Sequence, residues 1–152
     1  IEKSILKSKV SIYSSSSSKK YISKLEKYLN RNKYKNSYRI LLDEKKFYNV
    51  WWKNDIAITA SGNTLFERIA SGLPGASISQ FSQQFYIAKE FDTMGLNCNL
   101  NFNSRENRLN HDKFIKFLTD KKIIIEQIKK LKKNSSSDGI FQIYKEILKL
   151  NR

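Results

Sequence analysis

A repeated strand–turn–helix pattern in the middle of the sequence most constrains the fold. An apolar stretch at 55–59 leads into a small polar turn at 60–63, and helical spacing follows over 64–71. Gly72 and Pro74 then stand where a helix commonly ends. A second short strand and helix are predicted at 76–79 and 82–94. Strands that alternate with helices favour a mostly parallel sheet covered on both faces. We therefore predict an α/β fold of three layers, α/β/α.

The flanking segments extend this pattern in both directions. The serine run Ser14–Ser18 stands between a predicted strand and a predicted helix, which indicates a connecting turn rather than a linker. The closing helix is expected to be capped by Asp138. The patterns predict strands at 9–13, 38–42, 47–52 and 97–102, and helices at 19–30, within 110–134 and at 140–150.

Length and cysteine usage limit the class of protein. A chain of 152 residues is expected to form one domain, residues 1–152. The single cysteine, Cys98, excludes an internal disulfide framework and a four-cysteine zinc site. The sequence has neither an apolar run of about 20 residues nor a signal-peptide pattern, so a soluble cytoplasmic protein is predicted. Because the chain starts at Ile1 without an initiator Met, we expect a piece of a larger protein.

The formal charge of +15 raises the question of a polyanionic partner. Lysine supplies 23 of the 29 basic residues, a bias that base composition of the genome can also produce. The basic residues cluster at 19–39 and 113–133, and tyrosines interleave with the first cluster. Binding to nucleic acid is not favoured, yet a nucleic-acid or anionic-surface module remains the second hypothesis. The charge also permits peripheral contact with the inner face of a membrane.

The turn between the strand at 55–59 and the following helix is the first candidate site. Ligands of open α/β sheets bind where strands end and helices begin. Gly62 permits close approach of a ligand to the backbone, and Ser61, Asn63 and Thr64 offer hydrogen-bonding side chains. The helix N-terminus favours a phosphate group, and Glu67, expected on the first turn, can accept hydrogen bonds from ribose hydroxyls. The alternative is structural, with Ser61 or Asn63 as N-cap and Glu67 solvated.

A second polar pair opens the next predicted helix. The side-chain amides of Gln83 and Gln84 can reach the hydroxyls of a sugar or the edge of a base. Alone, two such residues at a helix start are commonly exposed without a binding role. Both junctions are nevertheless expected at the same edge of the sheet, which favours a shared nucleotide site.

The stretch 55–91 resembles the nucleotide-sugar signature in the C-terminal domain of GT-B glycosyltransferases. It is similar in particular to peptidoglycan UDP-N-acetylglucosamine transferases and to the UDP-sugar hydrolases of pseudaminic acid synthesis. Ser137-Asp138-Gly139 matches the residues before the last helix of the hydrolase group. The positions that carry the resemblance are Asp55, Ser61, Gly62, Thr64, Glu67, Gly72, Pro74, Gln84 and Ala88.

The resemblance implies a Rossmann-like C-terminal half of a GT-B fold that binds a UDP-sugar. By the same analogy, the turn residues hold the diphosphate, Glu67 binds the ribose, and Gln83 and Gln84 contact the sugar or phosphate. The resemblance also implies that catalytic residues come from an N-terminal partner domain, so none is assigned in this chain. No spacing of His, Cys, Asp and Glu predicts a metal site, and no cofactor is predicted. His111 is interpreted as a surface residue that caps the helix beginning near 110.

Overall fold

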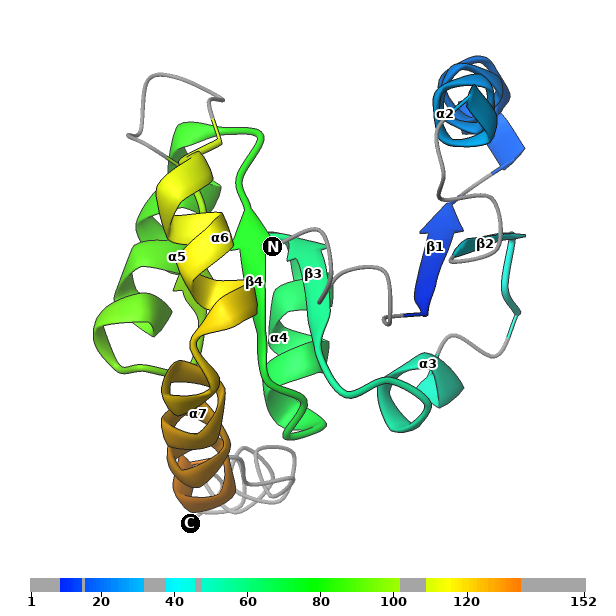
Figure 1. Ribbon diagram of the computed structural model, residues 1–152. Helices are drawn as coiled ribbons and strands as arrows, with labels where there is room; N and C mark the ends of the chain where they lie inside the picture. Colours follow the sequence, from blue (N-terminus) through cyan, green and yellow to red (C-terminus); the bar gives the residue numbers. More distant parts are fainter. Residues whose placement is uncertain (1–8, 15, 32–37, 46–47, 102–108, 135–152) are drawn as a thin grey trace, which may run out of the picture. The chain divides into compact units, whose positions relative to one another are not determined.

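The chain is an α/β protein with parallel strands (Figure 1). The computed structural model describes residues 9–14, 16–31, 38–45, 48–101 and 109–134. It divides into two compact units, residues 1–47 and 48–152. The predicted closing helix, with its cap Asp138, lies outside the described residues.

Unit 1 contains a parallel pair of strands and one amphipathic helix. Strand β1 (Val10–Ser14) pairs with β2 (Tyr38–Leu42), and Val10 lies opposite Tyr38. A short 3-10 helix, η1 (Ser16–Ser18), leads into helix α2 (Lys19–Arg31). Ile22 is the buried residue of α2. Both strands and the helix were predicted, and the serine run forms a strand-to-helix connection as expected.

Unit 2 contains a three-stranded parallel sheet in the order β3-β4-β5. Its elements alternate strand and helix through β5, in agreement with the predicted pattern. Their bounds are α3 Tyr48–Trp52, β3 Ala57–Ala60, α4 Asn63–Ala70, β4 Gly75–Ile78, α5 Ser82–Thr93, β5 Cys98–Asn99, α6 His111–Thr119 and α7 Lys121–Asn134.

The segment predicted as a strand at 47–52 folds instead as the short helix α3. Val50 and Trp51 are adjacent in sequence, and both are buried, whereas a strand would direct them to opposite faces. An apolar run of this length does not distinguish a strand from a buried helical turn.

Two apolar clusters lie in unit 2. One joins α4, α5 and the end of α7 through Leu65, Ile69, Ala88, Leu96 and Leu131. The other places Phe117 of α6 against Ala76, Cys98 and Leu100 of the sheet region. Since successive strand residues point to opposite faces, α6 covers the face of Ala76, while Arg68 of α4 covers the face of Gly75. Helices therefore cover both faces of this sheet.

Candidate functional site

The two predicted junctions lie at one edge of the sheet. Strands β3 and β4 are parallel and in register, so that Ala60 at the end of β3 lies opposite Ile78 at the end of β4. The backbone N–H of Ser61 donates to the carbonyl of Ile78 at 3.2 Å, which continues the pairing into the turn. The expectation that both strand–helix junctions open on the same edge is confirmed.

Helix α4 begins without a side-chain cap. Its N-cap is Gly62, with φ −94° and ψ −147°, and no side chain accepts from the first backbone N–H groups. The structural alternative, in which Ser61 or Asn63 caps the helix, is therefore wrong. Asn63 is the first helical residue and is exposed, and Thr64 is half-buried. The helix N-terminus consequently presents N–H groups that a ligand can use.

Ser61 cannot serve as a cap because its side chain lies in the interior. It is fully buried, and its Oγ accepts a hydrogen bond from Ser79 Oγ at 2.8 Å. Ser79 in turn is held by Asn101, whose Oδ1 accepts from the Ser79 N–H at 2.6 Å and whose Nδ2 donates to the Ser79 carbonyl at 2.9 Å. These buried contacts fix the two turns relative to each other.

Gln84 of α5 reaches across to the turn of α4. Its Nε2 lies 3.5 Å from the position that a Cβ on Gly62 would occupy. Its Oε1 accepts from the backbone N–H of Gln80 at 3.0 Å, which orients the side-chain amide. Gln84 is half-buried, while its neighbour Gln83 is exposed. The structure thus brings together Gly62 and Gln84, which are far apart in the sequence, and leaves Gln83 at the surface.

Glu67 is exposed, and its place on α4 differs from the prediction. The first turn of the helix contains no acidic residue, because the helix begins at Asn63 and Glu67 is its fifth residue. Glu67 follows Asn63 by four residues, so both lie on one side of the helix, about 6 Å apart along its axis. At this distance the Glu67 carboxylate does not occupy the N-terminal N–H groups, which stay accessible to a phosphate.

Sequence reasoning missed a row of buried polar residues, one of which supports this edge. Asn97, Asn99 and Asn101 alternate along β5 and its flanks, and all three are buried. Their spacing of two residues was a detectable signal, since it puts three amides on one face of a strand. Asn101 positions the turn at Ser79, so it belongs to the support of the candidate site.

Arg68 was also missed, and it lies at the opposite edge of the sheet. It is fully buried; its Nη1 donates to the Leu73 carbonyl at 2.8 Å and its Nη2 to Asn97 Oδ1 at 2.9 Å. Among the described residues, its Nε has no hydrogen-bond partner. Burial lowers the pKa of the guanidinium to about 10. Because Leu73 and Asn97 precede β4 and β5, this charge lies at the amino ends of the strands.

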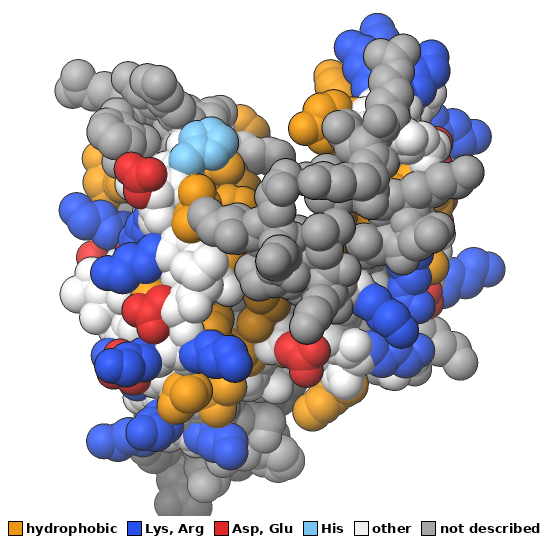
Figure 2. Space-filling model, viewed as in Figure 1, with side chains coloured by type: hydrophobic (Ala, Val, Ile, Leu, Met, Phe, Trp, Pro, Cys, Tyr) orange, Lys and Arg blue, Asp and Glu red, His pale blue; other side chains and the backbone are white. Residues whose placement is uncertain are grey.

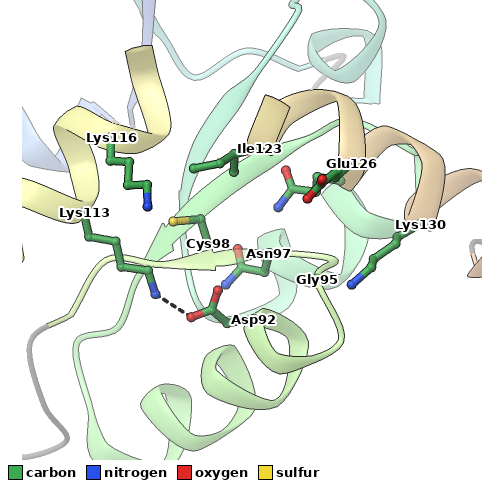
Figure 3. Close-up of a pocket in the computed structure, with 10 residues that line it drawn as sticks. Asp92, Gly95, Asn97, Cys98, Lys113, Lys116, Ile123, Glu126 and Lys130 are labelled. Atoms are coloured by element: carbon green, nitrogen blue, oxygen red, sulfur yellow. Dashed lines mark hydrogen bonds and ion pairs between the residues drawn. The ribbon is translucent and has the colours of Figure 1, made fainter. Parts of the chain in front are cut away.

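A pocket of about 320 Å³ also lies away from the candidate site (Figure 3). It is formed by the end of α5, the start of β5, and helices α6 and α7, and none of the seven predicted site residues lines it.

Trp51 is buried and Trp52 exposed, on α3. Asn110, rather than His111, caps α6 by accepting from the Lys113 N–H at 3.0 Å. Within the described ranges, no group of three or more His, Cys, Asp and Glu side chains is placed to hold a metal ion. No helix in the same part of the chain is long and apolar enough to cross a bilayer.

Neither the protein-family models nor the curated proteins compared with this sequence match it.

Proposed function

We propose that this chain binds a nucleotide sugar, specifically a UDP-sugar, at the edge formed by the ends of β3 and β4. The observation that carries the proposal is the uncapped N-terminus of α4 at Gly62, beside the Gln84 amide of α5. The fold that fits this role is a Rossmann-like C-terminal half of a GT-B enzyme. Such a parent protein would transfer the sugar or hydrolyse its diphosphate linkage during synthesis of surface polysaccharide or amino sugars.

The diphosphate is assigned to the start of α4. A helix N-terminus carries about half a positive elementary charge and directs unpaired N–H groups outward. Gly62 has no side chain between these groups and a ligand, and Thr64 adds a hydroxyl. Gln84 Nε2, oriented through Gln80, supplies a neutral donor from the neighbouring helix. A phosphate can therefore be bound by neutral donors without a lysine or arginine in contact.

The ribose and the sugar are assigned to exposed side chains beyond the phosphate. Glu67 lies one helical turn past Asn63, and its carboxylate can accept from the two hydroxyls of a ribose. Gln83 is exposed at the start of α5 and can contact hydroxyls of the sugar. The resemblance of 55–91 to GT-B nucleotide-sugar signatures assigns the same roles to these positions. It also implies that the catalytic residues come from a partner domain.

Calorimetry with matched acidic variants tests this assignment. We titrate the 152-residue chain with UDP and with UDP-N-acetylglucosamine, and repeat both titrations with Glu67→Ala and Glu90→Ala. Both glutamates are exposed, and Glu90 on α5 is the control. We expect Glu67→Ala to weaken binding by about tenfold, as for loss of a charged hydrogen bond, and Glu90→Ala to leave it unchanged. Absence of heat at millimolar ligand, or equal effects of the two variants, would reject the proposal.

One observation favours the second hypothesis, binding to single-stranded nucleic acid. On α2, Tyr21 and Tyr28 are 76% and 65% exposed, and the exposed Lys20, Lys24 and Lys27 lie between or beside them. Such a helix face combines aromatic surfaces with positive charge. On the face of the molecule drawn in Figure 2, the basic side chains are spread out with acidic side chains among them and do not form a single stripe.

A salt titration distinguishes the two functions. Binding of a single-stranded oligonucleotide through α2 should weaken steeply with salt, by a log–log slope of about −0.7 per phosphate neutralised, and should weaken further in Tyr21→Ala. Absent or salt-independent binding removes this hypothesis and leaves the nucleotide-sugar proposal standing.

A further inference from the structure

The pocket between α5, β5, α6 and α7 is lined by an unusual set of charged side chains. Lys113 and Lys116 of α6 lie on one side and Glu126 and Lys130 of α7 on the other, with Cys98 between them (Figure 3). Asp92, at the end of α5, also lines it. Three ammonium groups thus face two carboxylates around one cavity.

These charges do not neutralise each other. Lys113 Nζ pairs with Asp92 Oδ2 at 2.5 Å, which accounts for one positive and one negative group. Lys116 and Lys130 make no ion pair with any other residue in the described part of the chain. Lys130 is exposed, and the end of its side chain lies beside Gly95, where an added Cβ would come within 2.5 Å of the Lys130 Nζ. An excess positive charge therefore remains at the mouth of the pocket.

A second positive charge lies directly behind the pocket. Asn97 lines the cavity, and its Oδ1 accepts from Arg68 Nη2 at 2.9 Å. Arg68 is fully buried, and its bonded acceptors are uncharged carbonyl and amide oxygens. Its Nε finds no acceptor in the part of the chain that the structure describes. Charges in such a poorly solvated region are screened much less than at the surface. An anion in the pocket would thus interact with Arg68 as well as with the lysines.

We propose that this pocket binds a small phosphate dianion, the head group of a small organic phosphate. A phosphate monoester carries about two negative charges at neutral pH, which matches one excess ammonium group plus the buried guanidinium. Lysines bind phosphate as point charges. The volume of about 320 Å³ stands at the lower end of the range for small-molecule sites, which suits a small metabolite rather than a polymer. The site is separate from the nucleotide-sugar edge.

Amide chemical-shift mapping on the 152-residue chain tests the proposal. The probes are inorganic phosphate and glycerol 3-phosphate, each titrated at constant ionic strength with chloride as the reference. We expect saturable shifts at the amides of Gly95, Cys98 and Lys116. If glycerol 3-phosphate binds more tightly, the ligand of the pocket is an organic phosphate. If inorganic phosphate binds equally or more tightly, the ligand is the free phosphate ion. Both results support a phosphate site.

Matched lysine variants distinguish binding in the pocket from nonspecific attraction of an anion to a basic protein. Lys116→Gln and Lys130→Gln remove lining residues, and Lys129→Gln and Lys132→Gln remove exposed lysines of α7 that do not line the pocket. We expect each lining variant to weaken binding by about threefold to tenfold and each control to change it less than twofold. Asp92→Asn should strengthen binding, because it frees Lys113. Equal weakening by all four lysine variants, or shifts that do not saturate, would overturn the proposal.

Discussion

At the scale of single residues, Arg68 carries a positive charge into the interior of unit 2 without a carboxylate partner among the residues it bonds. Burying a charge is expensive unless hydrogen bonds replace its hydration. Here Leu73, Leu96 and Asn97 supply the acceptors, so one side chain links α4 to the segments that precede β4 and β5.

Replacing Arg68 with methionine should destabilise the protein by about 3 kcal/mol. The substitution keeps much of the volume but leaves three buried acceptors without their donor. Chemical denaturation followed by circular dichroism measures the loss, and Lys89→Met on the exposed side of α5 is the control. A loss below about 1 kcal/mol for Arg68→Met would show that the Arg68 hydrogen bonds contribute little to the stability of the fold.

Cys98 should react slowly with alkylating reagents. Burial raises the pKa of its thiol to about 11, with the Asp92 carboxylate adding to the rise while Lys113 and Arg68 oppose it. From the ordinary value of 9.0, this lowers the thiolate fraction at pH 8 by about 100-fold.

The rate of iodoacetamide reaction in the folded protein should therefore climb until about pH 11, whereas the denatured chain should level off near pH 9. The thiolate is disfavoured in the folded state, so the contribution of Cys98 to stability is lost as the pH rises from 9 to 11. Equal pH profiles for the folded and denatured chains would show that burial does not raise the pKa of the Cys98 thiol.

At the scale of elements, the alternation of strands and helices follows from local patterns, and its success at α2 and α4 reflects amphipathic spacing. The failure at α3 has a physical cause. Val50, Trp51 and Trp52 are apolar in succession, and only packing decides that the first two are buried while Trp52 is exposed.

The candidate site was predictable only in part. The turn at Gly62 and the junction at Gln84 were predictable from the strand–turn–helix pattern of the sequence. The inward turn of Ser61 could not, because it depends on Ser79 and Asn101 from the neighbouring strands. Glu67 is the fifth residue of α4 because the helix begins at Asn63. With Asn63 as the N-cap, the helix would begin at Thr64, and Glu67 would be its fourth residue.

Glycine at position 75 should be required for the pairing of β4 with β3 and for the packing of Arg68 against β4. An added Cβ would lie 2.1 Å from the Ala57 carbonyl oxygen and 2.9 Å from Arg68 Cδ. We expect Gly75→Ala to cost about 3 kcal/mol of stability. Gly62→Ala is the matched comparison, because its Cβ meets only Gln84 Nε2 at an ordinary distance, and about 0.5 to 1 kcal/mol is expected there. Similar losses at both positions would contradict the packing described.

At the scale of the whole molecule, the two compact units differ in how much structure protects their strands. The sheet of unit 2 has β4 at its centre, hydrogen-bonded on both sides, whereas the sheet of unit 1 pairs β1 with β2. Two-stranded sheets are marginally stable alone.

Hydrogen exchange should therefore separate the two units. We expect the amides of Ala76 and Ser77 in β4 to exchange at least about 100-fold more slowly than those of Ile12 and Ile40. Exchange followed by amide NMR measures the ratio residue by residue. Equal protection of the two sheets would indicate that they open in one cooperative step and would contradict this expectation.

The most direct test of the proposed nucleotide-sugar site is an amide NMR titration of the full chain with UDP. We expect saturable shifts of the backbone amides of Gly62, Asn63 and Thr64, together with the side-chain amide of Gln84. Shifts confined to the pocket around Lys116 and Gly95 would assign UDP to the phosphate site instead. That result, or the absence of shifts at Gly62–Thr64 in millimolar UDP, would contradict the proposed nucleotide-sugar site.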